Sequence, residues 1–292
     1  MNKEFYEGVV YRPPSEWNSL IIQSTIGCSH NQCSFCSMYK NKKFRIKSVE
    51  EVKSDIDIAK AICGDSRKIF LADGDALIRN TREQIEILSY IKKEMHMCER
   101  ITCYASPKSI LSKTEEELRA IKKAGIDMVY LGLESGSDKV LKDIKKGVTS
   151  EEIIKAAKKI KDVGIKLSVT AIIGIAGKEN YEEHARETGK ILSLINPEYL
   201  GLLTLMLEDG TELMEKWKCG QFTLSSQIDL LKETKLILEN IDSPGTVFRS
   251  NHASNYINLK GILNKDKQEM IKVLDKALDG EINLKLEKFR GL

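Results

Sequence analysis

The sequence predicts an α/β fold, a partial (β/α)6 TIM-like barrel followed by a C-terminal, mostly helical extension. Six short apolar runs alternate with longer amphipathic segments, a pattern that calls for a parallel sheet with helices outside it. The 292 residues are 41% hydrophobic and 30% charged, which is typical of a globular protein and excludes a disordered or fibrous chain. The spacing fits a partial barrel better than a doubly wound sheet. We expect a lead-in over residues 1–18, the barrel over 19–213 and the extension over 214–292.

Each predicted strand is a short apolar run, and each predicted helix carries apolar residues at helical spacing. The strands are Leu20–Ile26, Lys68–Ala72, Arg100–Ala105, Asp127–Leu133, Lys166–Ile173 and Tyr199–Leu207. The helices between them are Ser48–Ile62, Thr81–Met95, Thr114–Lys123, Ser150–Val163 and Asn180–Leu194.

Several helix ends can be recognised from single residues. Ser48 and Thr114 are capping residues followed by acids that suit a helix N-terminus. Gly125 and Gly164 follow two helices, where a left-handed backbone conformation is needed. After residue 221 the alternation weakens, and we expect two helices, Gln227–Asn240 and Lys265–Leu278, to flank a polar segment, Val247–Tyr256.

Charge and hydropathy narrow the class of protein. The net charge of +3 is too small to indicate nucleic acid or a membrane surface by itself. The first residues contain no apolar stretch of the secretory kind, and no later run approaches the length of a membrane span. We therefore expect a cytoplasmic protein. Seven cysteines in a reducing compartment are then buried thiols or metal ligands rather than disulfides.

Three cysteines stand together directly after the first predicted strand. Cys28, Cys33 and Cys36 lie within one short loop, and thiolate is the ligand that zinc and iron–sulfur clusters select. Three ligands leave one metal position open, as a catalytic site requires. Two alternatives remain, a zinc site completed by His30 and a set of buried thiols. We favour the catalytic interpretation, because a zinc knuckle does not need a scaffold of this size.

The cysteine loop, with Phe35 before its last cysteine, resembles the radical S-adenosylmethionine (SAM) superfamily. Its Cys-x4-Cys-x2-Cys spacing has one residue more than the commonest form. Gly132–Ser137 resembles the Gly-Leu-Glu-Ser motif of the tRNA-modifying and porphyrin-related branches. The segment Thr170–Glu179 is similar to the adenine-binding loop of the same enzymes, with alanine in place of the usual proline, and Leu207–Leu213 is similar to their Pro-Gly-Thr-Glu-Leu loop.

The resemblance implies an oxygen-sensitive [4Fe-4S] cluster on Cys28, Cys33 and Cys36, with SAM bound at its open iron. Reduction of the cluster would cleave SAM to methionine and a 5′-deoxyadenosyl radical, which abstracts hydrogen from the substrate. An electron donor such as flavodoxin or ferredoxin would be required. The implied SAM-binding residues are Asp73, Gly74, Asp75, Ser106, Glu134, Lys146, Thr170, Ile173 and Gly174.

Some of these residues have a simpler interpretation. Asp73 and Asp75 stand where relatives carry Gly-Gly-Glu, and Asp-Gly also favours an ordinary turn. Glu134 could pair with a nearby lysine instead of the cofactor. Lys146 stands where relatives often have an arginine for the methionine carboxylate, and it could equally belong to a solvated basic loop.

Two further segments are candidates for partners and substrate. The basic, aromatic-containing run Met38–Lys47 could dock an acidic electron donor or hold a phosphate or carboxylate, or it could be a solvated charge run. In Val247–Tyr256, the many hydrogen-bonding side chains suit a polar substrate or a capped surface loop. We name His252 and Tyr256 as candidate proton or hydrogen donors. The candidate substrate contacts are Arg249, Asn251 and Asn255.

The substrate is not readable from the sequence, but its class can be ranked. We recognise no cysteines for auxiliary clusters in the C-terminal part, no cobalamin-binding domain before the barrel and no RNA-binding module. A small-molecule substrate is therefore our first expectation and an RNA substrate our second. A non-catalytic iron–sulfur or zinc regulator comes third. We expect no membrane partner.

Overall fold

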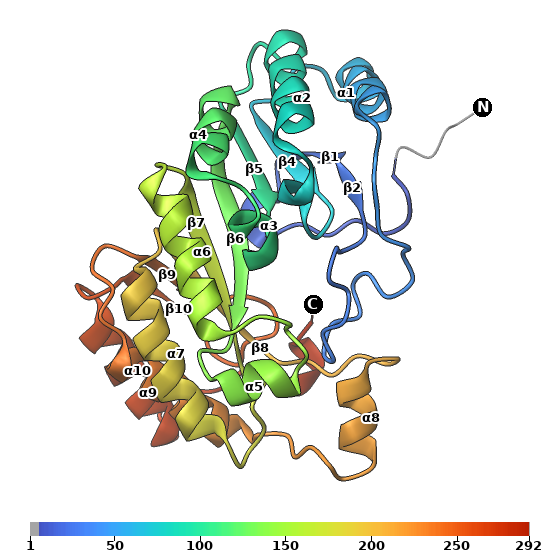
Figure 1. The fold of residues 1–292 in the computed structure, drawn as a ribbon. Coiled ribbons are helices and arrows are strands. Elements are labelled where there is room, and N and C mark those ends of the chain that lie inside the picture. The colour runs from blue at the N-terminus through green and yellow to red at the C-terminus, as the bar shows by residue number, and fades with distance from the viewer. Residues whose placement is uncertain (1–5, 292) are drawn as a thin grey trace. The chain divides into compact units, whose positions relative to one another are not determined.

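The computed structural model describes residues 6–291 (Figure 1). The chain forms two units, each with its own contacts. The first comprises Met1–Asn31, Met38–Leu131 and Lys158–Leu167, and the second comprises Gln32–Ser37, Gly132–Ala157 and Ser168–Leu292. The start of the expected lead-in, residues 1–5, lies outside the described residues.

Parallel strands form the centre of the first unit. β1 (Leu20–Gln23) pairs with β4 (Lys68–Ala72), β4 with β5 (Arg100–Tyr104), and β5 with the first part of β6 (Ile126–Glu134). Nearly all of these strand residues are buried, as expected for parallel strands whose faces are covered. A short core cluster lies across these strands and consists of Ile21, Phe70, Ala72, Met128 and Tyr130.

The first predicted strand is too long. It ends at Gln23, opposite Ala72, the last residue of β4. Backbone groups beyond that point need another partner. Thr25–Ile26 accordingly forms β2, which pairs antiparallel with β3 (Arg45–Ile46).

The helices of the first unit begin where capping residues predict. In α1 (Val49–Cys63) the Ser48 hydroxyl accepts from the Glu51 N–H, and α4 (Glu115–Ala124) has the same capping box at Thr114. Gly125 follows α4 with a φ of +139°, which confirms the predicted stop. α2 packs against both α1 and α4 (Figure 1). The remaining bounds are η1 (Pro14–Glu16), η2 (Ala76–Ile78), α2 (Thr81–Glu94) and α3 (Pro107–Leu111).

The second unit contains strands that the sequence analysis missed. β7 (Lys166–Ile173) and β8 (Tyr199–Thr204) are parallel, and β8 ends three residues before the predicted Leu207. β9 (Val247–Ser250) pairs parallel to β8 and antiparallel to β10 (Leu259–Ile262). The expected polar segment Val247–Tyr256 therefore begins as a strand.

Helices α7 (Tyr181–Ile195), α9 (Gln227–Asn240) and α10 (Lys267–Leu278) lie side by side (Figure 1). Gly189 allows the close approach of α7 to α9, since an added Cβ would lie 2.9 Å from the Asn240 carbonyl carbon. α9 matches its predicted bounds, and α10 starts two residues late. The other helices are α5 (Asp138–Asp143), α6 (Ser150–Asp162), α8 (Glu212–Lys218) and η3 (Glu287–Phe289).

In the part of the chain that the structure describes, each unit has parallel strands accompanied by helices. This arrangement confirms the predicted α/β class. Across residues 6–291, each helix is too short or too polar to cross a membrane.

Candidate functional site

The first cysteine of the loop lies against a glycine of the β4–η2 turn. A Cβ added to Gly74 would lie 3.0 Å from the Cβ of Cys28 and 2.8 Å from the Tyr39 ring. The Asn31 side-chain amide donates to the Tyr39 carbonyl at 2.9 Å and closes this part of the loop. Only glycine therefore fits at position 74 while Cys28 keeps this position.

The second and third cysteines belong to the second unit. The Cys36 N–H donates to the Cys33 carbonyl at 3.4 Å, which forms a turn. The intervening Ser34 donates its N–H to the Ile144 carbonyl and accepts from the Leu213 N–H, both at 2.9 Å. The cysteine turn is thus tied to the residue after α5 and to the start of α8. All three cysteines of the loop are partly exposed.

Asp73 contacts the residue directly before the first cysteine of the loop. Its fully buried carboxylate accepts from the Gly27 N–H at 2.9 Å, from the Gln23 amide at 3.2 Å and from the Lys42 ammonium at 2.9 Å. Lys42 belongs to the basic run expected to dock a partner, in which Arg45 also pairs with Glu51 and Lys47 with Asp55. Three charges of the run are therefore paired inside the first unit.

Asp75 brings together two predicted site residues and the cysteine loop. Its buried carboxylate accepts from the Ser106 hydroxyl at 2.8 Å, the Ser106 N–H at 3.1 Å and the Ser29 hydroxyl at 2.6 Å. Buried carboxylates are stabilised by donors of this kind. The carboxylates of both aspartates thus already accept hydrogen bonds from groups of this chain.

Glu134 and Lys146 are also brought together. The Lys146 ammonium lies 2.7 Å from Glu134 Oε1, and both side chains are largely buried. The backbone of Glu134 has a φ of +62°, the left-handed region that favours glycine. A Cβ on Gly132 would lie 2.0 Å from the Glu134 carboxylate oxygen. The glycine of the Gly-Leu-Glu-Ser motif is thus needed so that the carboxylate can fold back over it.

A buried polar network that the sequence analysis missed connects the ends of two strands. The Ser135 hydroxyl lies 2.7 Å from His184 Nδ1, and His184 Nε2 lies 3.2 Å from Glu233 Oε1. The same Glu233 oxygen accepts from the Gly174 N–H at 2.8 Å. These side chains have no solvent exposure. Among residues 6–291 the second Glu233 oxygen finds no hydrogen-bond partner.

The remaining predicted SAM contacts lie on β7 and just after it. Thr170 is partly exposed and Ile173 is buried, and the Ile173 carbonyl accepts from the Leu205 N–H at 2.9 Å. Gly174 has a φ of +83°. Its close neighbours are Leu205 and Leu230, at 3.7 and 2.8 Å from a built Cβ.

The candidate substrate residues occupy different environments. Asn255 is buried, where it accepts from the Thr204 hydroxyl and donates to the Leu202 carbonyl, both at 2.8 Å. His252 is half-buried beside Ser254, and burial lowers its pKa below the ordinary value. Two others, Arg249 and Asn251, are exposed.

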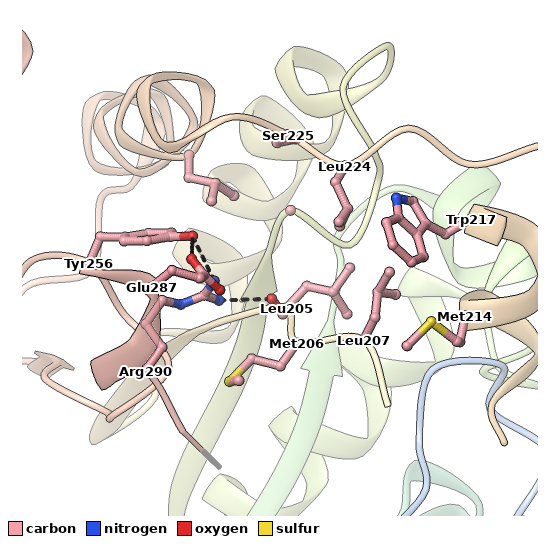
Figure 2. A pocket seen from close by; sticks show the side chains of 12 residues that line it. Leu205, Met206, Leu207, Met214, Trp217, Leu224, Ser225, Tyr256, Glu287 and Arg290 are labelled. Atoms are coloured by element: carbon pink, nitrogen blue, oxygen red, sulfur yellow. Dashed lines mark hydrogen bonds and ion pairs between the residues drawn. The ribbon is translucent and has the colours of Figure 1, made fainter. Parts of the chain in front are cut away.

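Tyr256 lines a cavity with a volume of about 320 Å³ (Figure 2), and so does Gly174, one of the predicted SAM contacts. The Tyr256 hydroxyl donates to Glu287 and accepts from Arg290 at 2.7 Å. The Arg290 guanidinium also lies over the Tyr256 ring, 4.2 Å from its centroid, and donates to the Leu205 carbonyl at 3.1 Å. Neither Glu287 nor Arg290 falls in a recognisable motif, so sequence reasoning did not find them.

Comparison with known proteins agrees with this arrangement. Residues 22–188 match the sequence profile described as the radical SAM superfamily. An uncharacterized methyltransferase of Pyrococcus horikoshii is 30% identical over 197 residues, which cover 67% of this chain and 41% of that protein. The 4′-phospho-dehydrooxetanocin synthase of Priestia megaterium is 27% identical over 228 residues, covering 70% and 31%. A tRNA uridine(34) acetyltransferase of Methanocaldococcus infernus is 32% identical over 113 residues, covering 37% and 21%. The chain thus spans well under half the length of these relatives.

Solved structures show the same fold. Methylornithine synthase superposes with a TM-score of 0.54 at 16% identity, covering 90% of this chain and 81% of that one. Coproporphyrinogen III oxidase from Escherichia coli superposes with a TM-score of 0.57 at 14% identity, covering 76% and 52%. At these identities the similarity concerns the fold alone.

Proposed function

Because this chain belongs to the radical SAM superfamily, whose enzymes use a [4Fe-4S] cluster and SAM, we propose that it cleaves SAM reductively to start radical chemistry on a small molecule. When bound, the cluster and SAM supply the electron and the 5′-deoxyadenosyl radical that takes hydrogen from the substrate. The superfamily match confirms the predicted class of enzyme and its cofactors. It favours an enzyme over the non-catalytic regulator.

The cysteine loop is the observation that carries this proposal. Cys28, Cys33 and Cys36 are partly exposed thiols on one loop, and their donor chemistry fits an iron–sulfur cluster with one open iron. Metal binding commonly orders its own ligands, and we propose that these three thiolates hold the cluster.

We propose that the predicted contact residues hold SAM by their charge and backbone. We assign the methionine carboxylate to the Lys146 ammonium. We assign the cofactor's hydroxyl or cationic groups to the Glu134 carboxylate. The two side chains form an ion pair, so a positive and a negative charge lie side by side. The turn at Gly74 would present backbone carbonyls to the methionine ammonium. We assign the ribose to the region of Ser106, and the adenine to Thr170, Ile173 and Gly174.

Anaerobic reconstitution with iron and sulfide tests the proposal. The wild type should bind about four irons and, with dithionite, release 5′-deoxyadenosine from SAM. Cys28→Ala should lose both properties, whereas Cys63→Ala, at an exposed cysteine at the end of α1, should keep them. SAM cleavage by the Cys28→Ala protein would overturn the assignment. Tetrahedral zinc with no response to SAM would instead favour a regulator.

An RNA substrate is the second candidate, because one similar protein is a tRNA uridine(34) acetyltransferase. RNA binding whose affinity falls steeply with salt would favour it. For the electron donor we propose flavodoxin or ferredoxin, and support of SAM cleavage by either protein in place of dithionite is the test. In the basic run Met38–Lys47, the cations of Lys42, Arg45 and Lys47 are paired with acids of this chain, so fewer positive charges remain there to dock an electron donor.

A further inference from the structure

We propose that the cavity beside Tyr256 in the second unit binds the substrate next to the adenine assigned to Gly174, which lines the same cavity, and that this substrate is a small, largely apolar molecule carrying an amine or hydroxyl group. This inference rests on the proposed function and gives it a substrate class. A cavity volume of about 320 Å³ lies at the lower end of the range of small-molecule sites.

The body of the ligand would lie against an apolar wall. Figure 2 shows Leu207, Met214, Trp217 and Leu224 gathered on the side of the cavity opposite Tyr256. Trp217 and Leu224 are each about two-fifths exposed, which is unusual for a cluster of large apolar side chains. Flexible methionine and flat indole surfaces suit an aliphatic or aromatic ligand.

The polar side of the cavity offers acceptors rather than donors. Arg290 uses four of its five N–H groups on Ser254, Tyr256, Glu287 and Leu205. The Tyr256 hydroxyl donates to Glu287 and accepts from Arg290, so the remaining hydrogen-bonding capacity is that of the Glu287 oxygens, which can only accept. The charges of Arg290 and Glu287 cancel. A ligand group that donates a hydrogen bond is therefore favoured over an anion.

Ser225 adds an independent observation. Its hydroxyl is buried at the wall of the cavity and has no hydrogen-bond partner among residues 6–291. Buried hydroxyls are normally paired, so an unpaired one at a cavity wall indicates a missing polar partner. A ligand hydroxyl or amine would satisfy Ser225.

The cavity is also tied to the segment that carries two of the cysteines. The Ser37 hydroxyl donates to Glu208 at 2.7 Å, and Glu208 follows the cavity residue Leu207. The Leu213 N–H donates to the Ser34 carbonyl at 2.9 Å, directly before the cavity residue Met214. A molecule in this cavity would thus rest on the chain segments that hold the Cys33–Cys36 turn.

Tryptophan fluorescence can test the inference with simple probes. The chain has two tryptophans, so Trp17→Phe leaves Trp217 as the sole reporter. In anaerobically reconstituted protein, cyclohexylmethanol and cyclohexylmethylamine should change its emission saturably. Cyclohexanecarboxylate, with the same apolar body, should bind at least tenfold more weakly. Leu224→Arg should weaken binding tenfold or more, whereas Ile62→Arg, at an exposed apolar residue of α1, should not.

Several results would overturn the inference. Absence of saturable binding or an equal effect of the two arginine variants would remove the site, and a preference for the carboxylate would remove the substrate class. Displacement of the alcohol by SAM would assign the cavity to the cofactor. The same titration on Cys28→Ala protein separates the two proposals, since probe binding there should persist without SAM cleavage. If Cys28→Ala still cleaved SAM, the proposed function would fail and the cavity assignment would remain.

Discussion

Replacing Glu233 with alanine removes the carboxylate that His184 and the Gly174 N–H share inside the second unit. The Gly174 donor would remain buried without its acceptor, which costs about 1–3 kcal/mol. The same substitution removes the oxygen that lies 3.2 Å from His184 Nε2. Because one carboxylate serves both groups, the two costs overlap, and we expect a loss of about 1–3 kcal/mol in the free energy of unfolding.

Two matched variants isolate the cause of that loss. Glu233→Gln keeps the shape and one acceptor oxygen for Gly174, so it should cost about 1 kcal/mol. Glu239→Ala lies on the same helix but at a partly exposed side chain, 3.8 Å from Lys235, and should cost less than about 1 kcal/mol. Urea unfolding followed by circular dichroism measures all three values. If Glu233→Ala cost no more than Glu239→Ala, the buried network would not stabilise the fold and the reasoning would be wrong.

Three further changes test the site. Gly74→Ala should lower the iron bound after reconstitution severalfold by pushing the cysteine loop away, whereas Gly291→Ala, with open space around it, should bind iron like the wild type. Gly132→Ala should weaken SAM binding at least tenfold in equilibrium dialysis, because its Cβ displaces the Glu134 carboxylate; unchanged affinity would count against that contact. Burial lowers the pKa of His252 below 6.5, so the unfolded state binds more protons between that lowered pKa and 6.5. Stability should therefore fall as pH drops below 6.5, and unfolding measured from pH 7.5 to 5 should show a smaller fall in His252→Asn.

The elements that the sequence predicted best carry their information locally. Capping at Ser48 and Thr114 marks two helix starts through bonds to residues three positions away. α9 was predicted at its observed bounds by its helical spacing. β9 was missed because it pairs with β8, almost fifty residues earlier, and only its alternating Phe248 and Ser250 are buried. A four-residue strand with this composition does not differ from a polar loop until its neighbour is known.

The same distinction applies to the site. The motifs located Glu134 and Lys146 as candidate cofactor contacts, and a glutamate–lysine pair was already one alternative. The buried histidine behind them was missed because its partners come from other elements, with Ser135 and Glu233 each 49 positions away. In a helix with many charged residues such as α7, helical spacing alone does not predict whether a histidine is buried or exposed to solvent.

Glu134 shows why the motif is best understood as a geometric unit. A non-glycine residue in the left-handed region costs about 1–3 kcal/mol, and glycine at position 134 would avoid that cost. The Lys146 ion pair offsets part of it, yet it also requires Gly132, which itself weakens a strand. A fold selected only for stability would gain nothing from this combination. The strained backbone of Glu134 is explained if its carboxylate must lie at this position to bind a ligand, which is the role that we propose for it.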